Sequence, residues 1–356
     1  MKKTPELLLS LVLFVLLFSC QAPLFKDDDA GPSENSAAWD SLNFESERPL
    51  LNLFASPFEL MAISENQFFR FDANQKLLEQ RPLSLASGHL GVPVISDNTF
   101  VRLTADAGAN HFLEFRLTRN PMQMIRLSVD SLKAPGDAYL EVEFLARRLG
   151  AFSDDGTLFL LPVKAFPAKR YALLLFEIRH NAAHDEFESV ELINRIALDD
   201  LDTDFANLVN IRFLDGNFYI SSQEGAWRLT PDGDLLELFP QWMIDFFQWQ
   251  GDLYVTGINT FDLHKSTDNG LNWTRLNQNT ILQFVETPND SLLNQNILGQ
   301  AWTIPTSDWS ATRPIKWPGG SDHQNPVAFY GLAALDGLFY FSIDRKIYFT
   351  DALETE

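Results

Sequence analysis

Residues 209–239 read VNIRFLDGNFYISSQEGAWRLTPDGDLLELF, and this stretch decides the fold that we expect for the chain. Short runs rich in apolar residues alternate there with the turn sequences Leu214-Asp215-Gly216-Asn217 and Thr230-Pro231-Asp232-Gly233. Glycine after aspartate favours a tight turn, because glycine adopts positive φ without a steric penalty. Short apolar runs between such turns are typical of β-hairpins. The stretch therefore predicts four antiparallel strands within its 31 residues.

The same strand–turn–strand pattern recurs along the chain at intervals of roughly 35 to 45 residues, a period typical of repeat architectures. A single four-stranded sheet cannot bury both of its faces, whereas sheets arranged in a ring cover one another. The repeat therefore predicts an all-β propeller of about seven four-stranded blades, with six or eight also possible. The other copies are FFQWQGDLYV at 246–255, AALDGLFYF at 333–341, and progressively weaker ones at 152–160, 95–101 and 62–70.

The positions of the repeats predict where each blade begins and ends and how the ring closes. Residues 40–51 are expected to add a strand to the last blade, which closes the ring and hides its open edges. The sixth blade is the least clearly patterned. The expected blades are 52–84, 88–127, 137–190, 195–239, 244–277, 280–318 and 325–352.

One hairpin carries a specific motif. Residues 266–273, STDNGLNW, match the pattern S-x-D-x-G-x-x-W through Ser266, Asp268, Gly270 and Trp273. This pattern resembles the Asp-box of sialidase-like and related propellers. The resemblance implies a hairpin between the third and fourth strands of a blade, in which the aspartate and glycine make the turn and the tryptophan packs beneath it. It also implies a structural role, away from any active site.

The first twenty residues, MKKTPELLLSLVLFVLLFSC, end at the only cysteine of the chain, Cys20. Residues 7–18 form an apolar run that would span roughly 18 Å as a helix, short of the ~30 Å bilayer core. We therefore interpret residues 1–19 as a signal peptide. The segment resembles a bacterial lipoprotein signal, which implies an acylated, palmitate-bearing Cys20 as the mature N-terminus. The alternative is an ordinary secretory signal that ends near a buried cysteine.

Residues 20–38 read as the acylated cysteine followed by a flexible acidic tether, and residues 39–356 as the propeller domain. Within the tether, residues 26–29, KDDD, resemble the short signal that sends some Bacteroidetes lipoproteins to the cell surface. The alternative is a solvated run of linker charges. The resemblance favours a lipid anchor in the bacterial outer membrane and leaves the periplasmic and cell-surface faces both open.

Charge excludes two classes of partner. The net charge is −21, and it becomes −22 once residues 1–19, with two lysines and one glutamate, are removed. Nucleic-acid binding requires a basic surface that displaces counterions, so we expect no nucleic-acid partner. Docking of a polybasic segment on anionic lipid is excluded for the same reason, which leaves the N-terminal lipid as the membrane contact. With one cysteine, no internal disulfide can form.

Two clusters resemble metal sites but are better explained as loops. His180 and His184 would share a face on a helix, yet they lie between two strand-like runs, so a polar hairpin loop is favoured over zinc. Asp200, Asp202 and Asp204 alternate like the start of a calcium loop, but the required glycine and bidentate glutamate are missing. We therefore expect no metal and no other cofactor.

Residues 301–323 hold three tryptophans, Trp302, Trp309 and Trp317, in a Pro- and Gly-rich stretch with a weak strand pattern. Aromatic wedges between blades are one interpretation, and a stacking surface for sugars or a peptide is the other. We hypothesise that this long irregular segment forms one wall of a partner site.

The sequence assigns no catalytic residue, because it has no phosphate loop, no G-x-S-x-G elbow and no H-E-x-x-H motif. The favoured function is an outer-membrane-anchored lipoprotein propeller that binds or scaffolds a glycan or an envelope protein. A sialidase-like glycoside hydrolase is one alternative, although the Arg-Ile-Pro signature of that family is absent and a single Asp-box is present. A structural component of an envelope assembly complex is the other.

Overall fold

The fold is that of a computed structural model. All described residues lie in one compact unit, Ser36–Glu356. The structure describes residues 40–55, 59–64, 67–82, 94–106, 108, 110–120, 123–142, 150–202, 208–257, 262–276, 283–286, 292–295, 301–304, 313–314 and 329–351.

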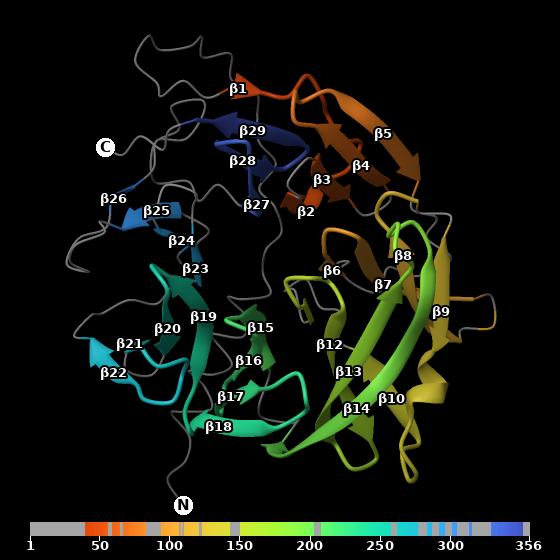
Figure 1. The fold of residues 1–356 in the computed structure, drawn as a ribbon, viewed down its shortest axis with the longest axis vertical. Coiled ribbons are helices and arrows are strands. Elements are labelled where there is room, and N and C mark those ends of the chain that lie inside the picture. The colour runs from red at the N-terminus through yellow and green to blue at the C-terminus, as the bar shows by residue number, and fades with distance from the viewer. Residues whose placement is uncertain are drawn as a thin grey trace, which may run out of the picture. The chain divides into compact units, whose positions relative to one another are not determined.

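The described residues form seven antiparallel sheets, six of four strands and one of five, arranged in a ring as Figure 1 shows. The expectation of an all-β propeller is confirmed. We number the sheets as blades in chain order. Blade 1 holds β2 (Leu50–Ala55), β3 (Glu59–Ser64), β4 (Gln67–Asp72) and β5 (Leu77–Pro82); blade 2 holds β6 (Val94–Ile95), β7 (Thr99–Ala105), β8 (His111–Leu117) and β9 (Met124–Ser128); blade 3 holds β10 (Tyr139–Val142), β11 (Ala151–Phe152), β12 (Leu158–Phe166), β13 (Arg170–His180) and β14 (Phe187–Asp202).

The remaining blades follow the same meander, from an inner first strand to an outer last strand. Blade 4 holds β15 (Leu208–Leu214), β16 (Asn217–Ser222), β17 (Ala226–Leu229) and β18 (Leu235–Phe239); blade 5 holds β19 (Met243–Trp249), β20 (Asp252–Gly257), β21 (Leu263–Ser266) and β22 (Thr274–Leu276); blade 6 holds β23 (Gln283–Glu286), β24 (Leu292–Gln295), β25 (Ala301–Ile304) and β26 (Arg313–Pro314); blade 7 holds β27 (Phe329–Leu335), β28 (Leu338–Ile343), β29 (Lys346–Thr350) and β1 (Asp40–Ser41).

The ring closes through its N-terminal strand. Asp40 lies opposite Phe349 and Ser41 opposite Tyr348, so β1 becomes the outer strand of blade 7. The expected closing strand is confirmed, although only its first two residues pair. The inner strands of neighbouring blades also meet, β27 against β2 and β15 against β19. The first and last described strands therefore pair within one sheet, and β29 has no free edge.

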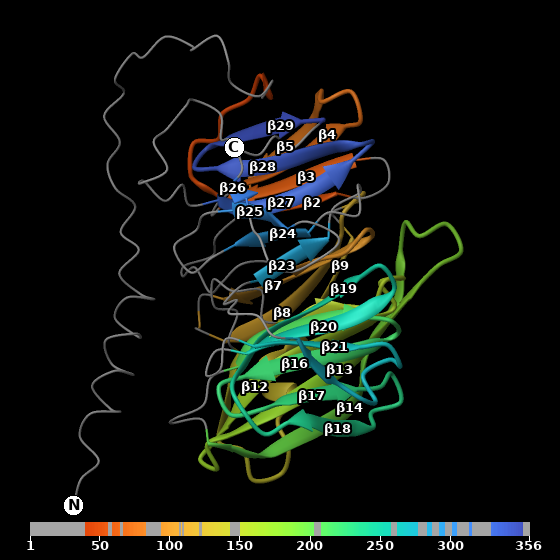
Figure 2. The same ribbon diagram turned by 90° about the vertical axis from the view of Figure 1, so that its left-hand side faces the viewer.

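Blade 3 differs from the expectation in two ways. Its first strand is split, because β10 and β11 both pair with β12. Its last strand, β14, has 16 residues and runs to Asp202, so residues 195–202 belong to blade 3 and not to blade 4. Asp200 and Asp202 therefore lie in a strand rather than in the expected acidic loop. Register shifts along the β13–β14 pair let these long strands bend, and their hairpin extends beyond its neighbours (Figure 2).

The segment expected to be the longest irregular stretch also contains strands. Residues 301–304 form β25 and residues 313–314 form β26, where Trp302 lies opposite both Asn294 and Pro314. The expectation of an irregular wall over residues 302–323 is corrected at these positions. Pairing with β24 supplies the backbone hydrogen bonds that the weak local pattern did not reveal.

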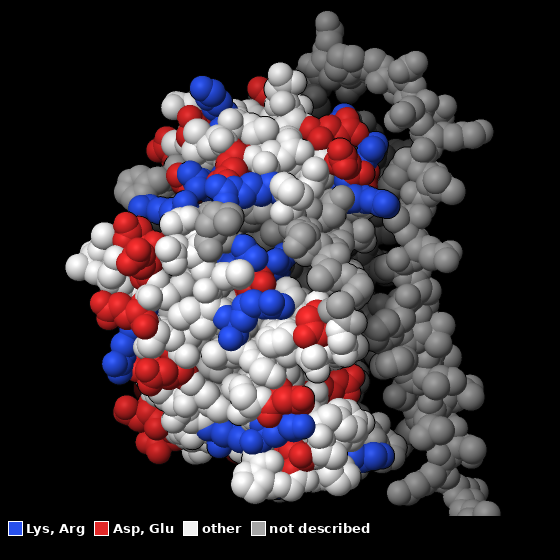
Figure 3. Space-filling view, turned by 90° about the vertical axis from the view of Figure 1, so that its right-hand side faces the viewer, with Lys and Arg blue, Asp and Glu red and all other residues white. Residues whose placement is uncertain are grey.

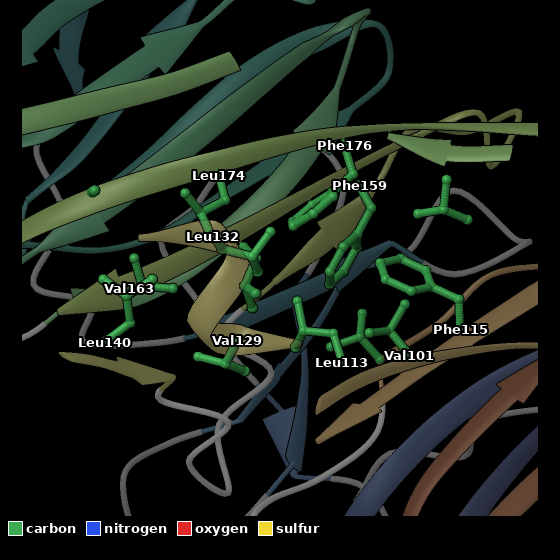
Figure 4. Packing of buried hydrophobic residues seen from close by; sticks show 14 of the residues in the cluster. Val101, Leu113, Phe115, Val129, Leu132, Leu140, Phe159, Val163, Leu174 and Phe176 are labelled. Carbon is green, nitrogen blue, oxygen red and sulfur yellow. The ribbon is translucent and has the colours of Figure 1, made fainter. Parts of the chain in front are cut away.

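The apolar core lies between blades rather than at one centre. Between blades 2 and 3, Phe115 packs edge-on against Phe159 with ring centroids 5.9 Å apart, and Val129 and Leu132 of the single-turn helix η1 (Val129–Leu132) join the same cluster, as Figure 4 shows. Fully burying one such side chain contributes about 1.5–3 kcal/mol. Each blade is therefore stabilised mainly by its neighbours. Within the described residues, no helix is long and apolar enough to cross a membrane.

Candidate functional site

The inner strands of blades 4 and 5 carry matching irregularities. The pairing register shifts between Leu208 and Asn210 in β15, and between Met243 and Asp245 in β19. A bulge of this kind re-aims the side chain that follows it. Strands β2 and β27 show the same shift, before Asn52 and Gly331 respectively. The bulge is therefore a repeated feature of the inner edge of the ring.

At the boundary of blades 4 and 5 the bulges bring polar side chains together. The Asp245 carboxylate is fully buried. It accepts a 2.5 Å hydrogen bond from Nδ2 of Asn210 and two bonds from Arg212, at 3.0 Å from Nε and 2.9 Å from Nη2. A buried charge is tolerated when it is paired and hydrogen-bonded in this way. Asp245 thus fixes the plane of the Arg212 guanidinium.

The Arg212 side chain is 28% exposed. Burial opposes its charge, but attraction to Asp245 outweighs that penalty and raises the pKa of Arg212 above its usual range. Among the described residues, Nη1 of Arg212 has no hydrogen-bond partner. The pair is neutral as a whole, and it presents an oriented N–H donor at the inner edge.

A serine ties the two inner strands together. Oγ of Ser221, on β16, donates to the carbonyl oxygen of Ile244 at 2.8 Å and approaches that of Asn210 at 3.3 Å. The amide N–H of Ile211 donates to Oδ1 of Asn210 at 2.9 Å. Because both Asn210 and Ser221 are buried, these bonds satisfy groups that would otherwise be costly to hide from water. The network therefore satisfies buried polar groups on both inner strands and links the two blades.

The four residues that match the Asp-box pattern lie elsewhere, in the hairpin between β21 and β22, the two outer strands of blade 5. Oγ of Ser266 donates to Asp268 at 2.8 Å and accepts from the Gly270 amide at 2.9 Å. The amide and side-chain N–H groups of Asn272 donate to the two Asp268 oxygens at 2.8 and 2.6 Å. Bonds from Asn272 and then Ser266 lower the pKa of Asp268 to about 2. These side chains define the shape of the turn.

Trp273 holds the turn from below. Its Nε1 donates to the Gly270 carbonyl oxygen at 3.1 Å, and its ring lies edge-on to Phe239 at 5.3 Å and Phe246 at 6.0 Å. The ring is half-buried, whereas the expected packing beneath the turn predicted a buried ring. Gly270 has φ +76°, and a Cβ there would approach the Tyr219 hydroxyl at 3.0 Å. Both glycine properties, conformational freedom and small size, are therefore used at this position.

The hairpin also joins blade 5 to blade 4. The carbonyl oxygen of Asn269 accepts a 2.8 Å bond from Nη1 of Arg228 and a 3.4 Å bond from the Tyr219 hydroxyl. Burial raises the pKa of Tyr219 to about 12, so its phenol stays a neutral donor. The motif residues thus lie at an interface between blades, on the outer strands, whereas the Asp245 network lies on the inner strands.

The other expected site residues are not brought together by the described part of the structure. Cys20, Trp309 and Trp317 lie outside the described residues, and of Trp302 only its place in β25 is described. Asp204 also lies outside the described residues.

His180 and His184 lie at the tip of the β13–β14 hairpin, as the expectation of a hairpin loop required. Nε2 of His180 lies 3.1 Å from Oγ1 of Thr99, and the two imidazole centroids are 5.6 Å apart. Burial, followed by the neighbouring His184, lowers the pKa of His180. Across the described ranges, no group of three or more His, Cys, Asp or Glu side chains is arranged to hold a metal ion.

Sequence reasoning missed Asn210, Arg212 and Asp245. A signal for the third position exists, because the inner strands LLNLFA, LVNIRFL and MIDFFQW each place a polar residue directly after two apolar ones and before another apolar one. Recurrence of a buried polar residue at one position of a repeat indicates a shared inner-edge feature. The β-bulges next to the third residue of each inner strand explain why a buried polar side chain is tolerated there.

The sequence matches no protein-family model and no curated protein. Solved structures are similar in fold. PorZ, a surface component of the type IX secretion system of Porphyromonas gingivalis, is 10% identical with a TM-score of 0.50, over 89% of this chain and 38% of that one. The extracellular domain assigned to a one-component system of B. thetaiotaomicron is 11% identical with a TM-score of 0.54, over 88% and 40%.

The WD40 domain of Pan2 from Neurospora crassa is 10% identical with a TM-score of 0.52, and the match covers 90% of this chain and 98% of that domain. This chain spans about two fifths of the length of the two bacterial structures. Sequence identities this low carry no information on activity. The similarity shows that the fold is a β-propeller.

Proposed function

We propose that this chain is a binding or scaffolding propeller of the bacterial outer membrane, anchored by a lipid on Cys20, which engages a glycan or protein partner at the inner edge of blades 4 and 5. The observation that carries the proposal is the pre-orientation of Arg212 by the buried Asp245. Ligands commonly bind where several elements converge, and the inner strands of a propeller converge on its axis.

The chemistry of this edge supports an uncharged, oxygen-rich partner. The Arg212–Asp245 pair is neutral in sum and offers a donor, which suits a sugar hydroxyl or a backbone carbonyl. Fixing a long side chain before binding removes an ordering penalty of about 0.5–1.5 kcal/mol. Because the bidentate contact with Asp245 depends on the guanidinium fork, lysine cannot substitute for arginine here.

The partner site is tested with the full chain in detergent. Binding to a glycan array, and capture of partners from solubilised envelope, are measured for the wild type, for Arg212→Lys and for a control, Arg345→Lys. Arg345 is about half exposed, lies in the turn between β28 and β29 of blade 7, and pairs with Glu45. We expect Arg212→Lys to weaken binding by about tenfold or more, since one good charged hydrogen bond contributes over ~1.4 kcal/mol, and the control to leave it unchanged. Equal binding by all three proteins would refute the proposed site.

The anchor is tested separately. Labelled palmitate should be incorporated into the wild type and not into Cys20→Ala, and the variant should lose its place in the outer-membrane fraction. The physical reason is that stable anchoring requires acyl chains, given the strongly negative charge of the chain. If Cys20→Ala still takes up label and fractionates with the outer membrane, the anchor proposal is wrong.

A further inference from the structure

The tip of the β13–β14 hairpin rests on the neighbouring blade. These two strands, of 11 and 16 residues, belong to blade 3, and their hairpin extends beyond its neighbours (Figure 2). Near the tip, Nε2 of His180 lies 3.1 Å from Oγ1 of Thr99, which belongs to β7 of blade 2. A hydrogen bond between two side chains therefore joins the end of the hairpin to another blade.

The blade 2 side of this contact is held in place by its own turn. The amide N–H of Thr99 donates to Oγ of Ser96 at 3.1 Å, and the carbonyl oxygen of Thr99 accepts from the Ser96 amide at 2.7 Å. Thr99 is fully buried, and in the described part of the structure His180 is the side chain that bonds its hydroxyl group. A buried hydroxyl group without a partner is costly, so this bond stabilises the docked position of the tip.

On the blade 3 side, the imidazole of His180 is enclosed by other rings. Phe187 lies opposite His180 across the hairpin, and their ring centroids are 5.3 Å apart. Phe187 also packs against the apolar cluster between blades 2 and 3. The centroid of the His184 ring lies 5.6 Å from that of His180. The half-buried His180 ring therefore has an aromatic ring, a second imidazole and a buried hydroxyl group as its neighbours.

These surroundings favour an uncharged imidazole. Partial burial disfavours the charged ring, and His184 repels it. Both effects lower the pKa of His180, and burial is the larger of the two. The result does not depend on which ring nitrogen carries the hydrogen in the neutral form, because a second proton brings a positive charge to the same place in either case. The docked tip therefore favours neutral His180.

No carboxylate among the described residues offsets these two effects. The elements around His180 are the 96–99 turn, the hairpin itself, and the 153–157 turn, where the Thr157 carbonyl oxygen accepts from the Ile178 amide. The charged or titratable side chains of these elements are Asp97, Asp154, Asp155, Glu177, Arg179, His184, Asp185, Glu186 and Glu188.

Several of these charged groups are bonded to other partners. Asp155 accepts from Oγ of Ser153 at 2.6 Å, and Asp185 accepts from Nδ2 of Asn181 at 2.7 Å. Arg179 pairs with Glu177 at 2.7 Å. In Figure 3 the hairpin projects at the left margin of the molecule, where Asp and Glu side chains lie beside it at the surface. A proton on His180 therefore gains no carboxylate partner in the docked state.

We propose that the hairpin tip is a pH-sensitive latch, in which neutral His180 docks residues 181–187 on Thr99 of blade 2 and protonation of His180 releases them. The released state binds the proton more readily than the docked state, because its imidazole is hydrated. Docking is therefore fully favoured above the pKa of an ordinary histidine, about 6.5, and weakens as the pH falls below that value. Histidine is the side chain whose charge changes in this range.

Release of the latch changes the surface that this side of the ring offers to a partner. The tip extends beyond the neighbouring blades (Figure 2), and its release exposes more of Thr99 and Phe187. A local change of charge that shifts one element between two positions is a common basis for pH sensing. The latch lies on blades 2 and 3, so it is independent of the partner site at Arg212.

The test measures amide hydrogen exchange in the full chain in detergent, at about pH 7.5 and about pH 5.5, with rates corrected for the intrinsic pH dependence of exchange. Peptides that cover residues 176–190 report on the tip, and peptides from β12 report on the body of blade 3. The proteins compared are the wild type, His180→Gln, His184→Gln and His111→Gln. Glutamine can bond the Thr99 hydroxyl group but does not titrate. His111 is the matched control, because it is an exposed histidine at the start of β8, on the same blade as Thr99.

We expect the tip of the wild type to lose protection by about threefold or more at the lower pH, while β12 stays protected. His111→Gln should behave in the same way. His180→Gln should show equal protection at both pH values, and His184→Gln a smaller loss than the wild type, because it removes the repulsion. A wild-type tip that is equally protected at both pH values, an unchanged pH response in His180→Gln, or a response abolished in His111→Gln would overturn the proposal.

Discussion

The inner edge of blades 4 and 5 and the face of blade 2 use the same chemical groups in different proportions. At the inner edge, one buried carboxylate, Asp245, holds one arginine and one asparagine. On blade 2, one buried carboxylate, Glu114, faces three arginines. One arginine and one carboxylate form a pair whose charges cancel, whereas on blade 2 three guanidinium groups from adjacent strands share one carboxylate. The two regions therefore differ in how many arginines a single buried carboxylate holds.

The largest effect is expected from removing the carboxylate of the matched pair. Asp245→Ala leaves the Asn210 amide and the Arg212 guanidinium without their buried partner, which destabilises a protein by about 3–5 kcal/mol. That is a large fraction of a typical free energy of unfolding of about 5–15 kcal/mol. Thermal unfolding followed by circular dichroism should show a clear fall in Tm. Asp245→Asn is the matched control, since it keeps the shape of the side chain and part of its hydrogen bonding. An unchanged Tm in Asp245→Ala would show that the buried carboxylate does not stabilise the inner edge.

A smaller effect is expected at the outer hairpin of the same two blades. Trp273→Ala removes a half-buried ring that packs on Phe239 and Phe246. Full burial would make this loss about 3–5 kcal/mol, so we expect about 2–3 kcal/mol for the half-buried ring. Denaturant unfolding measures the change. Partner binding by the folded variant should be unaltered, and a binding defect with normal stability would move the functional site to the hairpin.

A similar or smaller effect is expected from the carboxylate on blade 2. Glu114→Gln removes the charged acceptor that Arg102, Arg116 and Arg126 share, at a cost of about 1.5–3 kcal/mol for hydrogen bonds to a charged group. Denaturant unfolding measures this loss beside that of Asp245→Ala. A free energy of unfolding equal to that of the wild type would show that the shared carboxylate contributes nothing to stability.

The smallest effect is expected in the stability of the protein at acidic pH, through the carboxyl group of Asp268. The folded-state pKa of Asp268 is lowered from 3.8 to about 2, so its contribution to stability is present above pH 3.8 and is lost as pH falls toward 2. In Asp268→Asn this contribution is absent throughout. Urea unfolding across that range should show the wild type and the variant differing above pH 3.8 and converging near pH 2. A difference that stays constant down to pH 2 would contradict the lowered pKa.

Much of the fold could be predicted because its determinants are local. The Asp215-Gly216 pair makes a turn in which both residues have positive φ, and the equivalent Asp336-Gly337 pair does the same. The closing strand could also be predicted, since an open ring would expose a sheet edge. The boundary between blades 3 and 4 could not, because β14 continues through apolar and acidic residues alike, wherever β13 offers hydrogen bonds.

The sequence by itself determined the strands, the turns and the period, because each depends on neighbours a few residues away. It also determined that Ser266, Asp268, Gly270 and Trp273 would share one hairpin. Only the tertiary structure decided that Asn210 and Arg212 meet Asp245, which lies 35 and 33 residues further along the chain. It likewise decided that three arginines from three strands face Glu114. The physical reason is that register and blade packing set which polar side chains become neighbours, and neither is encoded in any one strand.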